Sequence, residues 1–534
     1  MTAATPRGPE KAPQWDQVEL TLVAERDTAN PYTDVDVYVD LTGPDGETLR
    51  RPAFWDGGRT WRVRFASPTA DGVWEWTSVA SVTGDAGLHG RSGQLRATPY
   101  RGDHPFTRHG LLRMSPGRRN VVHADGRPFL MVADTPWALP WRGTIETVRE
   151  YALDRQAKGL NAALLMSVQP DRDARGPRNR DDAGAFDVGF EDLPDGHLNQ
   201  LRPEYFQYLD HLLGVLHAHG IVPVLQPVFQ GFGWKGLRVL GTHAAPEEYA
   251  RYCRYLVARY GARPALWLVS GDGVGAYPCT IAGGEAIEAW DAYQQPTGFH
   301  YNPFDDWQAD FMEAKDCFHH NRACQDQPWL DFQWCQTGHE GKHLQHQVRR
   351  MHDHEPTKAV ANGEPTYEGM GKGAHGVDWW QGHEAWLNLT AGGTMGVVYG
   401  AAGLWQWKLL PDEPGWTEWC DVPGRSWREA MQQPGSRYPG YVGRALAEYD
   451  FADMTTLPQV HPRAVGKPGA FTCIYLPEGG EVSLASLQRE LPFRWFDPRS
   501  GTFAAGGCTG PARPTVAAPS PAPWVLLVGE PRAG

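Results

Sequence analysis

The stretch that decides the fold reads IVPVLQP at Ile221–Pro227, PEEYARYCRYLVARY at Pro246–Tyr260 and ALWLVSG at Ala265–Gly271. The two short apolar runs predict buried strands, and the segment between them predicts a helix. A strand, a helix and a second strand in this order are typical of a parallel sheet covered by helices. The rest of the fold follows from how far this alternation extends.

The alternation extends on both sides of this unit, over roughly 300 residues. We expect eight strands, at Arg127–Asp134, Leu160–Val168, Ile221–Pro227, Ala265–Gly271, Thr297–Tyr301, Trp329–Cys335, Lys358–Asn362 and Met395–Tyr399. We expect helices at Thr144–Lys158, Pro203–His219, Pro246–Tyr260, Gly284–Tyr293, Leu344–His352 and Asp378–Thr390. The pattern predicts a (β/α)8 TIM barrel. A doubly wound sheet is the alternative, but no glycine-rich phosphate loop follows the first strand.

The segments before and after the expected barrel show the strand pattern, with no predicted helices between the strands. Residues 15–100 alternate apolar and polar positions between Gly, Pro and Asp breakers, which predicts a β-sandwich. Short strands return after about Leu446, which predicts a second β-sandwich at the C-terminal end. The fold class is therefore α/β, a TIM barrel between two β-sandwiches. We expect an N-terminal domain at 1–104, a catalytic barrel at 105–443 and a C-terminal domain at 444–534.

Composition excludes several classes of partner. The net charge is −13 and no basic cluster occurs, which argues against nucleic acid and against an anionic membrane surface. No apolar stretch approaches the roughly 20 residues of a membrane span. The first 17 residues contain no apolar core of a secretory signal, and the eight cysteines are scattered. We expect a cytoplasmic protein with free thiols, or a secreted one if a leader precedes this sequence. Its 23 Trp residues suit either a core or flat surfaces for sugars.

Polar residues gather where the expected barrel strands end, which is where barrel enzymes carry catalysis. In chain order these are Asp134, Gln169, Gln226, Asp272, Asn302, Gln336 with His339, Glu364, and Trp405 with Trp407. Amides, aromatic rings and carboxylates suit a neutral substrate rich in hydroxyl groups. Asp272 and Glu364 follow the fourth and seventh strands, on opposite sides of the barrel mouth. One carboxyl can protonate a glycosidic oxygen while the other attacks the anomeric carbon or activates water.

Five motifs in order resemble the apiosidase-like branch of the retaining glycoside hydrolases, whose barrels belong to clan A. The matching segments are DGRPFLMVADTPW (Asp125–Trp137), VSGD (Val269–Asp272), WLDFQWCQTGH (Trp329–His339), ANGEPTYE (Ala361–Glu368) and TMGVVYGAAGLWQW (Thr394–Trp407). Trp61–Trp76 resembles the DUF5060-type β-sandwich that precedes such barrels, and Phe493–Gly501 resembles the small β domain that follows them. The resemblance covers nearly the whole chain.

The resemblance implies Asp272 as acid/base and Glu364 as nucleophile. It also implies a sugar site lined by Asp134, Trp137, Gln336, His339, Tyr367, Glu368, Tyr399 and Trp405. Ser270 and Gly273 depart from the family pattern, and the insertions Asp171–Arg202 and Cys279–Arg322 would form additional walls. We expect an exo-acting enzyme that releases a terminal sugar, such as the furanoses apiose or arabinofuranose, from a glycan or plant glycoside. No cofactor or metal is expected, and the oligomeric state is not indicated.

Two other functions remain open. His339-Glu340-Gly341-Lys342-His343 matches the H-E-x-x-H signature of zinc hydrolases, with Glu364 as a third ligand. Gly341 interrupts the helix that this signature requires, which argues against the hypothesis of a zinc hydrolase. A non-catalytic carbohydrate-binding protein would keep the same fold. The N-terminal sandwich has its own candidate sugar contacts at Trp55, Trp61, Trp74 and Trp76.

Overall fold

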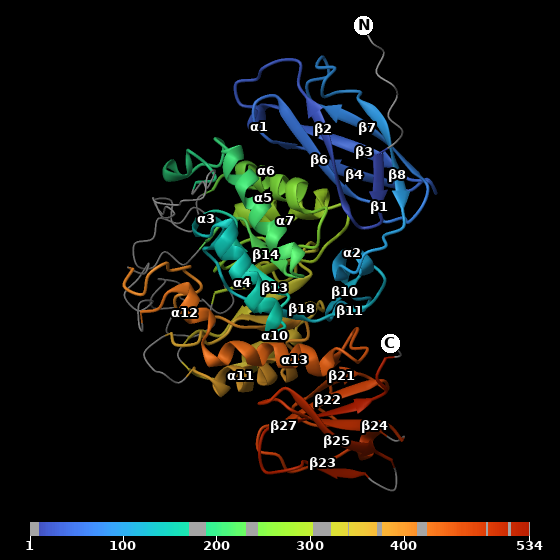
Figure 1. Ribbon diagram of the computed structural model, residues 1–534, viewed down its shortest axis with the longest axis vertical. Helices are drawn as coiled ribbons and strands as arrows, with labels where there is room; N and C mark the ends of the chain where they lie inside the picture. The colour runs from blue at the N-terminus through green and yellow to red at the C-terminus, as the bar shows by residue number, and fades with distance from the viewer. Residues whose placement is uncertain are drawn as a thin grey trace.

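Eight parallel strands form a closed barrel in the middle of the chain, between two β domains (Figure 1). The computed structural model describes residues 10–169, 188–230, 244–302, 322–339, 341–370, 376–413, 424–487, 490–510 and 514–532. The barrel strands are β12 (Met131–Asp134), β13 (Ala162–Met166), β14 (Val222–Gln226), β15 (Leu266–Leu268), β16 (Thr297–His300), β17 (Phe332–Gln336), β18 (Ala359–Glu364) and β19 (Gly396–Val398). The predicted fold class is confirmed.

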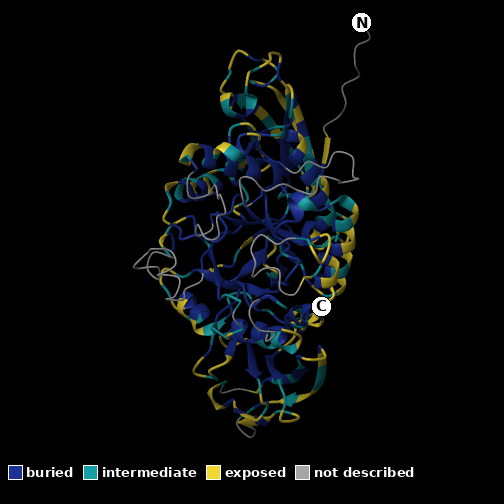
Figure 2. Cartoon of the chain, turned by 90° about the vertical axis from the view of Figure 1, so that its left-hand side faces the viewer, coloured by how far each residue is buried: buried dark blue, intermediate teal, exposed yellow. Residues whose placement is uncertain are grey.

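The barrel strands read as continuous apolar runs because both of their faces are covered. Every residue of β13 and of β14 is buried, by the barrel interior on one side and by helices on the other. Figure 2 shows the buried residues concentrated through the barrel. The covering helices are α4 (Ile145–Ala157), α5 (Pro203–Ala218), α6 (Pro246–Tyr260), α7 (Pro278–Trp290), α10 (Gln345–His352), α11 (Trp379–Thr390) and α13 (Tyr438–Leu446).

Two predicted elements differ from the structure. The expected first strand Arg127–Asp134 is divided into β11 (Pro128–Phe129), which pairs with β10 (Val121–His123), and the barrel strand β12. Helix α7 begins at Pro278, six residues before the expected start. Glycines are poor helix formers, so Gly283 and Gly284 led to a predicted start that is too late. Glycine is needed at position 284 because a Cβ there would overlap the indole of Trp329.

The N-terminal β domain consists of a five-stranded and a three-stranded sheet. Their strands are β1 (Glu10–Pro13), β2 (Gln17–Val23), β3 (Val37–Thr42), β4 (Thr48–Pro52), β5 (Phe54–Trp55), β6 (Thr60–Ala66), β7 (Val73–Ala80) and β8 (Ser92–Thr98). Trp61 and Trp74 belong to the hydrophobic core of this domain, so they are not available as sugar platforms. Trp55 and Trp76 are half-buried.

The C-terminal β domain has a six-stranded and a two-stranded sheet. The larger sheet contains β20 (Thr455–Thr456), β21 (Ala464–Lys467), β22 (Phe471–Leu476), β24 (Pro492–Asp497), β25 (Thr502–Cys508) and β27 (Trp524–Gly529). It packs on helix α11, where the rings of Trp386 and Tyr475 stack. Helix α13 runs across the predicted domain boundary at 443/444. Among the described helices, none has the length and apolar character of a membrane span.

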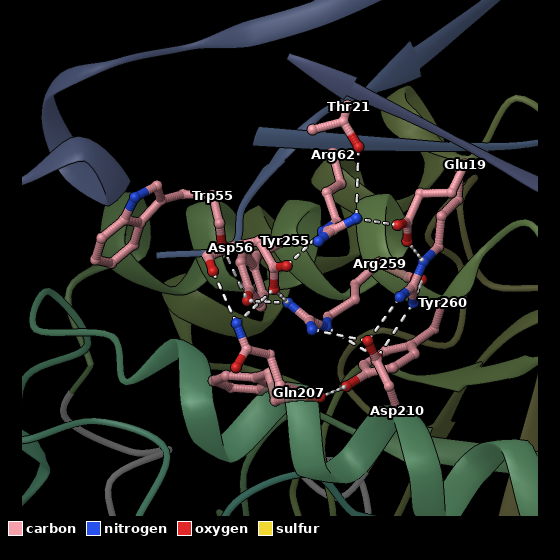
Figure 3. A network of polar contacts seen from close by, with 12 residues as sticks. Glu19, Thr21, Trp55, Asp56, Arg62, Gln207, Asp210, Tyr255, Arg259 and Tyr260 are labelled. Carbon is pink, nitrogen blue, oxygen red and sulfur yellow. Dashed lines mark hydrogen bonds and ion pairs between the residues drawn. The ribbon is translucent and has the colours of Figure 1, made fainter. Parts of the chain in front are cut away.

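Buried charges join the N-terminal sandwich to the barrel helices α5 and α6 (Figure 3). Arg259 on α6 donates to Asp56 of the sandwich at 2.9 Å and to Asp210 on α5 at 2.7 Å. Arg64 of β6 donates to the same Asp210 at 2.6 Å and 3.1 Å. Burial opposes the charge on Asp210, but the two guanidinium groups outweigh it and lower the pKa of this carboxyl. Asp210 therefore joins the sandwich to the barrel.

We expect Asp210→Asn to lower the free energy of unfolding by about 1.5–3 kcal/mol, because it removes the charge that two guanidinium groups share and leaves each with one carboxylate, Asp56 for Arg259 and Glu19 for Arg64. Thermal unfolding followed by circular dichroism measures the change. The matched control is Glu150→Gln, which breaks the exposed 2.9 Å pair with Arg428 and should cost less than about 1 kcal/mol. Equal losses in the two variants would contradict the role of Asp210.

Candidate active site

Asp272 and Glu364 lie at the same end of the barrel. Asp272 follows β15 in a left-handed backbone conformation, with φ +47°. Its neighbours are glycines for a steric reason, since a Cβ at Gly271 or Gly273 would overlap the amide oxygen of Gln226 or Gln230. The backbone can therefore turn sharply at the strand end, and the Asp272 carboxyl is presented at the barrel mouth.

Glu364 is the last residue of β18, and a bulge in this strand brings it into place. Pairing between β17 and β18 runs from Phe332 onward, but the register shifts between Cys335 and Gln336, so that Gln336 pairs with Glu364. The residue skipped on β18 is Gly363, where a Cβ would overlap the indole of Trp334. The glycine and the bulge together direct the Glu364 carboxyl to the strand end.

The two carboxyl groups are close and differ in their environment. Side-chain oxygens of Asp272 and Glu364 and a ring nitrogen of His300 all lie within 4.8 Å of one another. Burial, followed by the charge of Glu364, raises the pKa of Asp272 well above its ordinary value. Burial also disfavours the charge on Glu364, but hydrogen bonds from His300 and His339 outweigh it and lower the pKa of this carboxyl. Near neutral pH the pair therefore holds one acid and one anion.

His300 was missed by the sequence analysis, which chose Asn302 at the end of the fifth strand. Its Nε2 lies 3.1 Å from Oε2 of Glu364 and 3.4 Å from Oδ1 of Asp272. The sequence could have indicated His300, because side chains alternate along a strand and residues 300 and 302 therefore share a face. Both polar side chains are buried at this strand end.

Three of the predicted sugar contacts form a chain of hydrogen bonds that begins at Glu364. They are His339, Tyr367 and Trp137. His339 lies 2.8 Å from Oε1 of Glu364 through Nε2, and its Nδ1 accepts the backbone N–H of Tyr367 at 3.2 Å. The Tyr367 hydroxyl accepts from the indole N–H of Trp137 at 2.9 Å. Since Nδ1 of His339 is an acceptor, Nε2 carries the proton that is donated to the carboxylate. The ring of Trp405 lies at the edge of the same aromatic group, 6.5 Å from Trp137.

The predicted glutamines also lie at strand ends. Oε1 of Gln226 is 3.2 Å from Nδ1 of His300. Gln336 pairs in register with Glu364. Gln169 follows β13 and is buried. Both amide atoms of Gln169, and Oε1 of Gln336, find no hydrogen-bond partner within the described ranges. Buried amides without partners are suited to the hydroxyl groups of a ligand.

Four other predicted contacts are occupied by the protein itself. Asp134 is fully buried and accepts from Arg155 at 2.5 Å and from the Tyr151 hydroxyl at 3.2 Å. Glu368 accepts from the Tyr399 hydroxyl at 2.6 Å and from two backbone N–H groups. These three predicted residues, Asp134, Glu368 and Tyr399, therefore support the barrel wall and are not free to bind a sugar.

Trp407 is the fourth of these residues. It is fully buried, and its indole stacks on Trp427 with the ring centroids 4.5 Å apart and the planes at 6°. Its other neighbour is Tyr151, with ring centroids 5.6 Å apart. Aromatic side chains therefore cover the ring of Trp407, where a sugar contact was expected.

The zinc motif does not form the helix that it requires. Helix α10 begins at Gln345, after the motif, and Gly338 and Gly341 adopt positive φ angles. His343 stacks on Trp380 with ring centroids 3.9 Å apart, whereas His339 contacts Glu364. Glu340 lies outside the described residues. Over the described ranges the group spaced for a metal ion is Asp272, His300 and Glu364. We interpret this group as an acid pair with its histidine, because burial and the charge of Glu364 raise the pKa of Asp272 and so favour its protonated form.

Models of two known families match the chain, one over the barrel and one over the N-terminal domain. The model of the apiosidase-like catalytic domain matches residues 115–453, which is more than half of the chain. A second model, a domain of unknown function called DUF5060, matches residues 11–81. A search of curated proteins finds no match.

Solved structures share the architecture. A protein of Bacteroides vulgatus ATCC 8482, provisionally called a glycoside hydrolase, matches with a TM-score of 0.70 and 16% identity, over 98% of this chain and 100% of that one. A glycoside hydrolase family 5 protein of the same organism matches with a TM-score of 0.63 and 19% identity, over 80% and 94% of the two chains. At these identities the similarity shows the fold alone.

Proposed function

Because the chain belongs to the apiosidase-like family and is a glycoside hydrolase, we propose that it releases a terminal sugar by a retaining double displacement. Asp272 is the acid/base in this proposal and Glu364 is the nucleophile. The observation that carries the proposal is the spacing of the pair, since a carboxylate oxygen of Asp272 and one of Glu364 lie within 4.8 Å of each other. Retaining enzymes hold their carboxyl groups about 5–5.5 Å apart, whereas inverting enzymes need about 6.5–9.5 Å to admit a water molecule.

The two protonation states suit the two steps. In the first step, protonated Asp272 gives its proton to the glycosidic oxygen while ionised Glu364 attacks the anomeric carbon, and the alcohol leaves. In the second step, the Asp272 carboxylate takes a proton from water, whose oxygen attacks the anomeric carbon and releases Glu364. Each step ends with the protonation state that the next one requires.

The substrate is a neutral sugar in this proposal. Trp137 and Trp405 supply aromatic surface, and His339 and Tyr367 supply polar atoms beside the nucleophile. The amides of Gln169 and Gln336 supply partners for hydroxyl groups. We propose a furanoside such as an apioside or arabinofuranoside. Exo action depends on the insertions at Asp171–Arg202 and Cys279–Arg322, whose central parts lie outside the described residues.

We expect Asp272→Asn and Glu364→Gln each to lower kcat/KM by more than about 100-fold without unfolding the protein. Activity requires ionised Glu364 and protonated Asp272. The rate should therefore rise with pH through the pKa of Glu364 and fall through the pKa of Asp272. The fall at high pH should disappear in Asp272→Asn, and azide should partly restore this variant. Turnover near that of the wild type in either variant would remove the assignment.

A panel of aryl furanosides and pyranosides should reveal hydrolysis of at least one furanoside. Proton NMR of the first product should show the anomer of the substrate. An inverted first product would disprove the double displacement while leaving the glycosidase activity in place.

A metal-dependent hydrolase is the second candidate, because Asp272, His300 and Glu364 have a spacing that a cation also accepts. We expect the active enzyme to contain no stoichiometric zinc and to keep its rate in a chelator, as measured by mass spectrometry of metals and by a dialysis assay. Loss of activity with the metal, and recovery on its return, would favour this candidate. Sugar binding without turnover across the panel would instead indicate a non-catalytic binding protein.

A further inference from the structure

His300 lies beneath the two carboxyl groups and is closed off from solvent. Its side chain has no exposed surface, whereas the side chains of Asp272 and Glu364 each keep 8% of theirs. The two acids can therefore meet a ligand at the barrel mouth, and the imidazole meets the acids. Any effect of His300 on the reaction must act through those carboxyl groups.

The atoms that face one another have no competing partners. Nε2 of His300, Oδ1 of Asp272 and Oε2 of Glu364 make no hydrogen bond to any described residue, and the contacts between them are ion-pair distances of 3.1 Å and 3.4 Å. Leaving a buried polar atom unpaired costs about 1–3 kcal/mol, so the close approach of Nε2 to the two carboxyl oxygens is the interaction that offsets this cost. The contact at 3.1 Å to Glu364 is the shorter of the two that Nε2 makes.

Gln226 fixes the orientation of the imidazole ring. Its Oε1 lies 3.2 Å from Nδ1 of His300, and this contact holds one side of the ring. Gly271 makes room for this amide, since a Cβ there would overlap Oε1 of Gln226. With Nδ1 engaged, Nε2 is directed at the carboxyl pair.

The ionisable groups around Glu364 come from four strand ends. They are Asp272 after β15, His300 on β16, His339 after β17 and Tyr367 after β18. His339 contacts Oε1 of Glu364 and His300 contacts Oε2. Each oxygen of this carboxylate therefore has its own imidazole.

We propose that His300 is a positioning residue, whose Nε2 keeps Glu364 ionised and sets its distance from Asp272, while Gln226 fixes the ring. The proposal rests on the proposed function, which gives the two acids their roles. His300 is buried and does not contact the substrate in this proposal, but the different protonation states of Asp272 and Glu364 depend on it.

Two substitutions of His300 separate this role from simple packing. A glutamine can place an amide N–H near the position of Nε2, whereas the shorter asparagine reaches only the position of Nδ1. His300→Asn should lower kcat/KM by roughly 100-fold, the usual effect of a misplaced reacting group. It should also move the acidic limb of the pH profile to higher pH, because Glu364 loses a donor that lowers its pKa. His300→Gln should keep the acidic limb close to that of the wild type.

A second variant tests the ring-fixing step. Gln226→Leu should lower kcat and leave KM unchanged, because it disturbs the acid pair and not substrate binding. A raised KM with unchanged kcat would show that Gln226 binds the substrate, which would overturn this part of the proposal. His123→Gln is the control for losing a buried histidine, since His123 contacts Gly110 far from the pair along the chain. Its pH profile should match that of the wild type.

A measurement without substrate distinguishes failure of this proposal from failure of the proposed function. The infrared difference between the wild type and Glu364→Gln reports the ionisation of this carboxyl as the pH is varied. Its midpoint should rise in a His300→Asn background and stay in place in a His300→Gln background. Equal midpoints with equal losses of activity would assign His300 a packing role and overturn the proposal. A raised midpoint in a protein that hydrolyses no glycoside would uphold the role of His300 and refute the glycosidase chemistry.

Discussion

Two carboxyl groups buried within 4.8 Å of each other impose the constraint on which the site depends. Burial and mutual repulsion prevent both from being ionised at once, so one must keep its proton. The asymmetry comes from their neighbours, because imidazoles contact both oxygens of Glu364, whereas Oδ1 of Asp272 has the carboxylate and His300 beside it. Two chemically similar side chains thus differ in their environment, which is the difference that the proposed double displacement requires.

The barrel meets this constraint with local backbone irregularities. Asp272 turns off its strand in a left-handed conformation between two glycines, and Glu364 follows a glycine that the indole of Trp334 overlies. A regular strand end would direct alternate side chains inward or outward but would not bring two of them to this spacing. Such irregularities are stable because the surrounding strands and helices are fully packed.

The two flanking β domains support the site by packing on helices of the barrel. The N-terminal sandwich is joined to α5 and α6 by arginines and aspartates whose charges are buried (Figure 3), and the C-terminal sheet packs on α11. Helix α11 follows the segment that carries Glu364 and Tyr367, and α5 and α6 flank β14, the strand of Gln226. Both domains therefore support helices whose neighbouring strands carry the site, although neither domain contributes a described residue to it.

The sequence by itself determined the barrel and the two acids, because strand length, helical period and polar residues at strand ends are local features of the chain. It also placed Trp137, His339 and Tyr367 near Glu364 through the family resemblance. Only the tertiary structure decided which polar strand ends converge. Barrel closure brings His300 beneath the acids, engages Asp134 with Arg155 and Glu368 with Tyr399, covers Trp407 with Trp427, and separates His343 from His339. These outcomes depend on contacts between residues far apart in the chain, which no local pattern of residues encodes.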